Sequence, residues 1–183
     1  MIIGITGTLG AGKGTVVDYL VKQKSFRHYS VRGFLIKEIE KRGLPVNRDS
    51  MVVVANDLRA SFSPSYITDC LYDEAVAVGD SNAVIESIRA VGEITSLRAK
   101  GNFTLWAVDA LPELRYKRIV GRGSETDHIT YEKFLADEAT EMESTNPTKQ
   151  NLKACMALAD HTFTNNGSVA DLEQAVAIQL QNL

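Results

Sequence analysis

The sequence predicts an α/β protein in which a five-stranded, mostly parallel sheet lies between layers of helices. Short apolar runs suited to strands recur along the chain, and helical stretches separate them, an alternation typical of parallel sheets. The expected strands are residues 2–6, about 27–31, 82–86, 103–108 and 161–164. The fourth run is nearly continuous in apolar residues, as in a strand buried on both faces. These two observations give the fold class.

Composition and charge restrict what the chain can do. Its 183 residues suffice for one domain, predicted to span 1–183, and 44% hydrophobic with 23% charged residues is ordinary for a soluble globular protein. The net charge of −3 provides no basic excess for a nucleic-acid backbone, so no nucleic-acid partner is expected. Cys70 and Cys155 are far apart and form no zinc or redox motif. Because no signal peptide or membrane span is recognisable, we expect a cytoplasmic protein without a membrane partner; the oligomeric state stays open.

A glycine-rich segment between the first strand and the first helix is the most specific feature. It reads Gly7-Thr8-Leu9-Gly10-Ala11-Gly12-Lys13-Gly14-Thr15. Glycines let backbone N–H groups approach phosphate oxygens, a helix N-terminus adds positive partial charge, and Lys13 supplies a full charge. A plain turn is the simpler interpretation, but glycines and a lysine at these spacings favour a phosphate-binding loop. We therefore expect ATP to bind through Thr8, Leu9, Gly10, Ala11, Gly12, Lys13, Gly14 and Thr15.

Two oxygen-bearing side chains are candidates to hold magnesium. Gly14 stands where a magnesium-binding hydroxyl is expected, and Thr15 offers that hydroxyl one residue later. Glu86 ends an apolar strand, at the edge where open α/β sheets place their ligands. Its carboxylate can hold the water shell of Mg²⁺ or accept a hydrogen bond from an attacking hydroxyl. A glutamate facing solvent is the alternative, which the phosphate-binding loop makes less favoured.

Helices in succession are expected between the second and third strands, in an insertion of about 32–80. This is more than a simple crossover needs, so we expect the second substrate, the acceptor, to bind there. One of these helices is predicted to begin at Ser63-Pro64, with serine as N-cap and proline at the first helical position. For the acceptor's phosphate, Arg89 is suited to a bidentate contact, and Arg32 and Arg59 are further candidates. The competing interpretation of Arg89 is a surface arginine at a helix start.

An arginine row precedes a polar stretch at residues 124–130. Arg115, Arg118 and Arg122 are spaced three and four residues apart, which places them within roughly 60° of one another on a helix. Such a row suits a lid, at about 118–145, that closes on transferring phosphates. A solvated charged face is the alternative.

The last third of the chain is predicted to be mostly helical. Thr130 is expected to cap a helix that continues through Met142, and Asn146-Pro147 is expected to begin another. Ser168 fits the start of the last helix. The expected buried stripe of that helix is Val169, Leu172, Val176 and Leu180.

Together these motifs resemble the nucleoside monophosphate kinase branch of the P-loop kinases, which includes adenylate and dephospho-coenzyme A kinases. The chain is similar to small archaeal adenylate-kinase-like proteins and to the kinase-like domain of some fungal deoxycytidylate deaminases. Beside the phosphate-binding loop, the likeness involves short segments at 42–45, 86–89, 114–118, 159–160 and 166–168. The resemblance implies a P-loop NTPase fold in three α/β/α layers, with a helical acceptor-binding insertion and a short lid.

The resemblance also implies roles for individual residues. Lys13 would hold the β- and γ-phosphates, Arg118 and Arg122 would be lid arginines, and Asn166-Gly167 would lie in the loop that packs on adenine. One departure concerns the acceptor site. Adenylate kinases carry T-G-D-x-x-R after the second strand, whereas this chain has Ser30-Val31-Arg32-Gly33-Phe34-Leu35-Ile36, without an arginine near Ile36. Arg32 and Arg59 are the candidates to replace it.

The expected function is magnesium-dependent transfer of the γ-phosphoryl group of ATP to a small nucleotide-type acceptor. The acceptor could be a nucleoside or deoxynucleoside monophosphate, or dephospho-coenzyme A, and the sequence does not decide among them. Lys13, Glu86, Arg118 and Arg122 are the expected catalytic residues. The alternative is a nucleotide-dependent switch or assembly-factor ATPase that acts through a protein partner. A kinase needs its acceptor to release ADP, whereas a switch responds to a macromolecule.

Overall fold

The computed structural model describes residues 1–79, 82–122, 129–146 and 149–183. Its sheet has five strands in the order β2-β3-β1-β4-β5, and every pairing between them is parallel. The strands are β1 (Ile2–Gly7), β2 (Arg27–Ser30), β3 (Ala83–Glu86), β4 (Phe103–Asp109) and β5 (His161–Thr164). The predicted strands and fold class are therefore confirmed.

The register of the sheet brings functional segments to one edge. Ile5 of β1 lies opposite Glu86 of β3 on one side and opposite Trp106 of β4 on the other. The glycine-rich loop that leaves β1 therefore emerges between the carboxyl ends of β3 and β4. In parallel sheets of this kind ligands bind at that edge.

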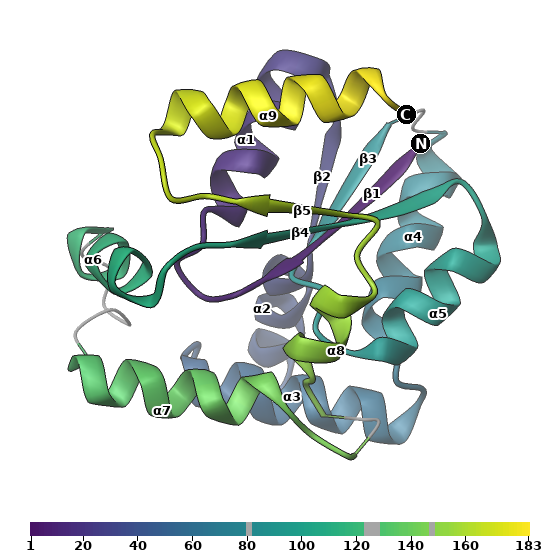
Figure 1. Cartoon of the computed structure of the whole chain (residues 1–183). Coiled ribbons are helices and arrows are strands. Elements are labelled where there is room, and N and C mark those ends of the chain that lie inside the picture. Colours follow the sequence, from purple (N-terminus) through teal and green to yellow (C-terminus); the bar gives the residue numbers. More distant parts are fainter. Residues whose placement is uncertain (80–81, 123–128, 147–148) are drawn as a thin grey trace.

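Helices cover both faces of this sheet. The chain runs through α1 (Lys13–Lys24), α2 (Val31–Lys41), α3 (Arg48–Ser61), α4 (Tyr66–Val78), α5 (Val91–Lys100), α6 (Pro112–Arg122), α7 (Tyr131–Met142), α8 (Leu152–Ala157) and α9 (Val169–Gln181). Figure 1 shows α1 and α9 on one side of the sheet, with α4, α5 and α8 on the other. Between β2 and β3 lie the three helices α2, α3 and α4, in the interval where the sequence predicts an insertion.

The core consists of two apolar clusters separated by the sheet. Ile3 and Ile5 of β1 pack with Val16 and Leu20 of α1 and with Val176 of α9. The other cluster combines side chains of β3 and β4 with those of α2 to α5, among them Leu35, Leu58, Ile67, Ile85, Leu97 and Leu105. Because successive strand side chains point to opposite faces, β1 supplies residues to both clusters.

Helix starts match the sequence where a side chain caps the first turn. Thr130 accepts a hydrogen bond from Lys133 N, and α7 continues through Met142 as predicted. Ser168 and Asp171 form a capping box at the start of α9. The prediction for Ser63-Pro64 is wrong: residues 63–66 form a turn closed by Tyr66 N donating to Ser63 O at 3.1 Å, and α4 begins only at Tyr66.

Three further expectations need correction or lie outside the described residues. Val169, the first residue of α9, is 61% exposed, whereas Leu172 and Val176 are buried. Of the expected segment at Asn146-Pro147, Pro147 is outside the description, and α8 begins at Leu152 with Asn151 as its N-cap. Most of the polar stretch 124–130 also lies outside it, since residues 123–128 are not described.

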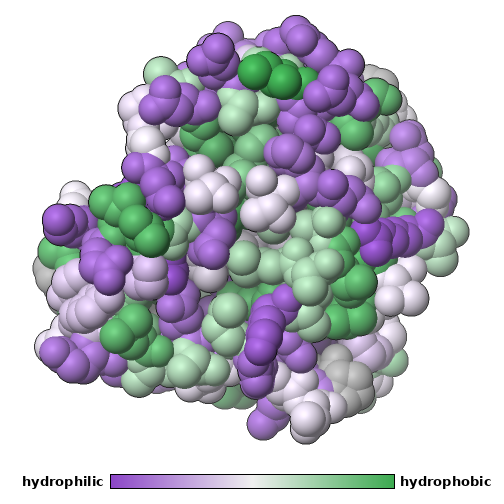
Figure 2. Space-filling view, viewed as in Figure 1, coloured by the Kyte–Doolittle hydropathy of each residue, from purple (hydrophilic) through white to green (hydrophobic). Residues whose placement is uncertain are grey.

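The visible surface is mixed in character. Figure 2 shows strongly hydrophobic residues as separate spots between hydrophilic ones on the face turned to the viewer. Scattered apolar side chains of this kind are ordinary on a folded protein. Within the described ranges, the helices are too short or too polar to cross a membrane.

Candidate active site

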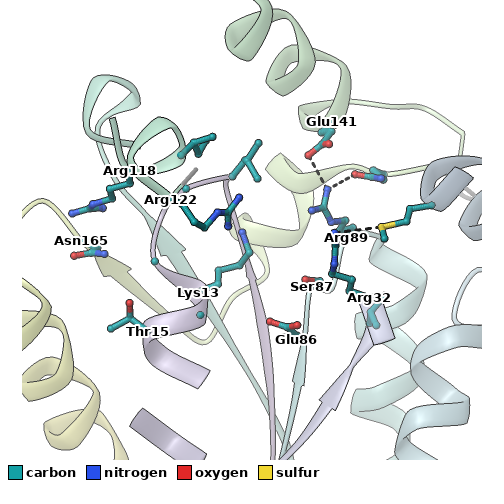
Figure 3. A pocket seen from close by; sticks show the side chains of 18 of the residues that line it. Lys13, Thr15, Arg32, Glu86, Ser87, Arg89, Arg118, Arg122, Glu141 and Asn165 are labelled. Atoms are coloured by element: carbon teal, nitrogen blue, oxygen red, sulfur yellow. Dashed lines mark hydrogen bonds and ion pairs between the residues drawn. The ribbon is translucent and has the colours of Figure 1, made fainter. Parts of the chain in front are cut away.

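A cavity of about 840 Å³ opens at the carboxyl edge of the sheet. The glycine-rich loop and the start of α1 form its floor, and α2 and α3, the end of β3, α6 and the loop after β5 form its walls. Figure 3 shows Lys13 near the centre, with Arg118, Asn165 and Thr15 on one side and Arg32, Ser87 and Arg89 on the other. We name the first side the donor end, because the sequence predicts ATP binding there, and the second the acceptor end, because the sequence predicts that the second substrate binds there.

Two glycines of the loop, Gly10 and Gly12, are required because neighbouring atoms lie too close for a side chain. Gly12 has a φ of 104°, and a Cβ there would lie 2.3 Å from Asn165 Nδ2. Gly10 has a φ of 78°, and a Cβ there would lie 2.6 Å from Arg115 O. Side chains other than hydrogen are therefore excluded by both strain and contact. Gly14 differs, because it lies inside the first turn of α1 and a Cβ there would meet nothing within 4 Å.

Lys13 folds back onto the loop that carries it. Its Nζ donates to Gly7 O at 2.8 Å and to Thr8 O at 2.7 Å. Burial lowers the pKa of Lys13 from 10.5 to about 7; the nearby charge of Arg89 acts in the same direction, while Glu141 and Glu86 oppose it. A bound polyanion would restore the charged form, so the site is electrostatically prepared for phosphate.

Thr8 and Ala11 support the loop from inside the protein. Thr8 Oγ1 donates to Asp109 Oδ1 at 2.6 Å, and the same carboxylate oxygen accepts from Ala110 N at 2.9 Å. Both Thr8 and Ala11 are buried and neither lines the cavity, whereas Leu9, Gly10, Gly12, Lys13, Gly14 and Thr15 do. Sequence reasoning missed Asp109, although its position directly after the apolar run 103–108 was a usable signal.

Glu86 lies at the boundary between the two ends of the cavity. Its Oε1 is 3.3 Å from His28 Nε2 and accepts a hydrogen bond from Ser30 Oγ at 3.1 Å. The hydrogen bond from His28 is the main reason that the pKa of Glu86 is lowered, with Ser30 and Lys13 contributing and burial opposing. The carboxylate is therefore ionised at neutral pH. Sequence reasoning assigned no chemistry to His28, His128 or His161; His128 lies outside the described residues.

Two oxygen-bearing side chains of the cavity are chemically suited to magnesium. Glu86 and Thr15 both line the cavity and offer a carboxylate and a hydroxyl, the hard ligands that Mg²⁺ prefers. The described residues contain no group of three or more His, Cys, Asp or Glu side chains that could cage a metal. Magnesium usually retains several waters and needs few protein ligands, so Thr15 and Glu86 fit this ion.

At the acceptor end, Arg89 follows the strand that carries Glu86. Its Nη1 donates to Glu141 Oε2 at 2.7 Å and to Gln150 Oε1 at 2.8 Å. The dashed lines in Figure 3 mark these contacts. Arg89 is only partly exposed and its guanidinium lines the cavity, so it is not the surface arginine of the competing interpretation.

The other two acceptor candidates reach the same end from the insertion. Arg32 of α2 is exposed and its Nη1 lies 3.5 Å from Met51 Sδ. Arg59 of α3 is only 2% exposed and its Nη2 donates to Glu93 Oε1 at 3.1 Å. Both arginines line the cavity beside apolar groups of α2 and α3, namely Val31, Leu35, Met51, Val52 and Ala55.

The three arginines of α6 lie in two different environments. Arg118 and Arg122 line the cavity, and Arg118 Nη2 lies 3.5 Å from Gly167 O. Arg115 is 3% exposed and turns into the protein instead, where it pairs with Glu138 of α7 through two nitrogens and donates to Ala110 O at 2.8 Å. The expectation of one shared face is therefore wrong for Arg115, because this side chain is buried against Glu138 of α7, whereas Arg118 and Arg122 line the cavity.

The loop after β5 reaches the donor end through Asn165. This residue is buried, and its Nδ2 donates to Ala11 O at 2.8 Å. Asn166, which sequence reasoning selected, is exposed and its Oδ1 accepts from Leu111 N at 2.9 Å outside the cavity lining. Gly167 lines the cavity as expected. Two adjacent asparagines gave no signal as to which of them points inward.

Curated proteins similar to this chain come from archaea. A UPF0200 protein of Thermococcus gammatolerans is 24% identical over 100% of this chain and 95% of its own length. A UPF0200 protein of Methanocaldococcus jannaschii is 28% identical over 93% of this chain and 84% of its own length. These relatives agree with the chain along nearly its entire length, but their names state no activity.

Solved structures with a similar fold include kinases. TT1252 from Thermus thermophilus superposes with a TM-score of 0.67 at 20% identity, over 100% of this chain and 97% of that one. Shikimate kinase from Bacteroides thetaiotaomicron gives a TM-score of 0.56 at 12% identity, over 99% and 98%. The chain therefore has the α/β fold of the P-loop NTPases. Since the AAA domain profile matches residues 3–146, most of the sequence, the chain belongs to the AAA domain family.

Proposed function

We propose that this protein is an ATP-dependent phosphotransferase that moves the γ-phosphoryl group of ATP to a nucleotide-type acceptor. The acceptor class comprises nucleoside and deoxynucleoside monophosphates and dephospho-coenzyme A. One observation carries this proposal: a single cavity joins a phosphate-binding loop to a second group of arginines, with the ionised Glu86 between them. An enzyme that only hydrolysed ATP would have no use for the second group.

The donor end is suited to a triphosphate. Lys13 and the backbone N–H groups of residues 9–15 would hold its phosphates, and the loop with Asn165 and Gly167 would border its base. Arg118 and Arg122 would face the charge that develops on the transferring group. A magnesium ion held by Thr15 and Glu86 would supply further charge neutralisation on the phosphates.

The transfer itself requires little covalent chemistry from the protein. The bond between the γ-phosphorus and the bridging oxygen of ATP breaks, ADP leaves, and an acceptor oxygen forms the new bond to phosphorus. If that oxygen is a hydroxyl, its proton passes to Glu86 or to water; if it belongs to a phosphate, no proton is released. Positioning and charge stabilisation would provide most of the rate enhancement.

The acceptor end is suited to a molecule with an anionic group and an apolar face. Arg32, Arg59 and Arg89 offer cations, while the side chains of α2 and α3 offer an apolar wall. A nucleoside monophosphate or dephospho-coenzyme A combines a phosphate with an aromatic base. These matches favour such acceptors over a small polar metabolite without a ring.

The experiment is a panel of acceptors scored by ADP release and by the phosphorylated product. Nucleoside monophosphates, deoxynucleoside monophosphates and dephospho-coenzyme A are each supplied with ATP and magnesium. We expect one of them to raise ADP release with matching product, and Lys13→Met to abolish this turnover while the variant stays folded. ADP release that no acceptor stimulates, but that a macromolecule does, would replace the proposal with the switch or assembly-factor ATPase.

A further inference from the structure

Glu93 is a buried carboxylate that joins two of the three arginines at the acceptor end. It lies in the first turn of α5 and is 0% exposed. Its Oε1 accepts from Arg59 Nη2 at 3.1 Å, and its Oε2 accepts from Arg89 N at 2.7 Å and from Ala90 N at 2.9 Å. A single side chain therefore fixes both the guanidinium of Arg59 and the backbone from which Arg89 projects.

In the part of the chain that the structure describes, the pairing with Glu93 leaves two hydrogen-bond donor atoms of Arg59 without a partner. Its Nε and Nη1 are buried and have no hydrogen-bond partner among the described residues. An unpaired buried donor of a charged group is costly, so such a group calls for an explanation. Since Arg59 also lines the cavity, an anion that enters the acceptor end would provide the missing acceptors.

The charges at this end indicate which anion fits. Arg32, Arg59 and Arg89 are positive, whereas Glu93 and Glu141 are negative. Glu93 is buried beneath the arginines and stays in place, but Glu141 belongs to α7 and reaches Arg89 from across the cavity. If the ligand displaces Glu141, two net positive charges remain. A phosphate monoester, with about −1.5 to −2 charges at neutral pH, matches that number better than a carboxylate does.

We infer that Glu93 is a positioning residue that holds Arg59 and Arg89 as a two-arginine clamp for the phosphate monoester of the acceptor. This inference rests on the proposed function, because it names the residues that would recognise the acceptor's phosphate. Glu93 does not contact the ligand. It acts by fixing the guanidinium of Arg59 and the backbone that carries Arg89, so its removal weakens anion binding without changing the donor end.

The test uses the intact protein with magnesium and ADP bound at the donor end and inorganic phosphate as the probe. Phosphate affinity is measured by calorimetry for the wild type, Glu93→Gln and Glu93→Asp. We expect Glu93→Gln to weaken phosphate binding by about tenfold or more, the loss expected for one charge-assisted contact. ADP affinity should stay within about twofold, and Glu93→Asp, which keeps the charge, should recover part of the phosphate affinity.

The matched control is Asp160→Asn. Asp160 also pairs with an arginine, Arg98, and also accepts from a backbone N–H, that of Leu105. It does not line the cavity. This substitution should leave phosphate binding unchanged, which separates the loss of a clamp from the general cost of removing a carboxylate.

A second variant covers the possibility that Glu93→Gln does not fold. The double substitution Arg59→Met with Glu93→Gln removes both charges of the buried pair, a change that proteins often tolerate. We expect it to fold and bind ADP but to lose phosphate binding. Wild-type phosphate affinity in either variant, or an equal loss of ADP and phosphate affinity, would overturn the inference.

The two proposals fail in different ways. If the acceptor panel shows no phosphoryl transfer but phosphate binding still depends on Glu93, the clamp stands and the proposed function fails. If transfer is found and Glu93→Gln leaves the acceptor KM unchanged, the proposed function stands and the clamp fails.

Discussion

Arg89 Nη1 donates to Glu141 Oε2 at 2.7 Å, and this ion pair joins the end of β3 to the last turn of α7. Both side chains are mostly withdrawn from solvent, so water and salt screen the pair less than an exposed one. The carboxylate of Glu141 binds the same guanidinium, that of Arg89, that we propose as a ligand of the acceptor's phosphate. An acceptor must therefore compete with a group of the protein itself.

The first prediction follows from this competition. Glu141→Gln should lower the acceptor KM several-fold, because the neutral amide binds Arg89 less tightly and leaves the guanidinium available. The ATP KM should change less. Glu143→Gln is the matched control, since Glu143 lies just beyond α7 and forms an exposed pair with Lys153. A higher acceptor KM in Glu141→Gln would show that Glu141 supports acceptor binding instead of opposing it.

The second prediction separates Arg115 from Arg118. Arg115→Met leaves Glu138 without its bidentate partner and should lower the free energy of unfolding by about 2–4 kcal/mol. Arg118→Met should keep most of that stability and reduce kcat, because its guanidinium lines the cavity. Chemical denaturation and steady-state kinetics on both variants provide the comparison. Equal stability losses would mean that the two arginines share one structural role.

The third prediction concerns two glycines of the loop. Gly12→Ala should destabilise the protein and abolish nucleotide binding, since its φ of 104° and the nearby Asn165 leave no room for a Cβ. Gly14→Ala should instead raise the free energy of unfolding by about 0.5–1 kcal/mol, because alanine favours a helix interior and the space is open. Thermal unfolding of the nucleotide-free variants measures both changes. A lower free energy of unfolding in the Gly14→Ala variant would contradict the conclusion that there is space for a Cβ at position 14.

The fourth prediction is a pH-dependent uptake of protons. The pKa of Lys13 is about 7 without ligand, and bound phosphates should return it toward 10.5. Above pH 7 the free protein therefore lacks a proton that the complex holds. Binding of magnesium and ADP should take up close to one proton at pH 8.5 and only about a tenth of one at pH 6.

Calorimetry in buffers of different ionisation enthalpy measures this uptake. The matched control is Lys13→Arg, because a guanidinium stays protonated throughout the range. The difference between the two proteins at each pH removes the contributions of the nucleotide and buffer. The same uptake at pH 6 and pH 8.5, or the same values for Lys13→Arg, would refute the lowered pKa.

Local patterns in the sequence determined the strands, most helix starts and the phosphate-binding loop. These features depend on residues that are neighbours along the chain. The loop needs glycines at particular φ angles between a strand and a helix, and Thr130 and Ser168 cap helices through bonds to residues three positions away. Periodicity and spacing record such requirements directly. The same local reasoning predicts that Glu86 lies at the end of β3.

The tertiary structure alone decided which polar side chains meet. Arg59 and Glu93 are 34 residues apart, and Arg89 and Glu141 are 52 apart, so no spacing rule links them. Helical spacing grouped Arg115 with Arg118 and Arg122, but packing against α7 turned Arg115 inward. The sequence does not indicate which of the adjacent residues Asn165 and Asn166 points inward. The hydrogen bond from Asn165 to Ala11 O, which forms only in the folded protein, decides this. The direction and charge environment of a side chain depend on which distant elements cover it, and that information exists only once the chain has folded.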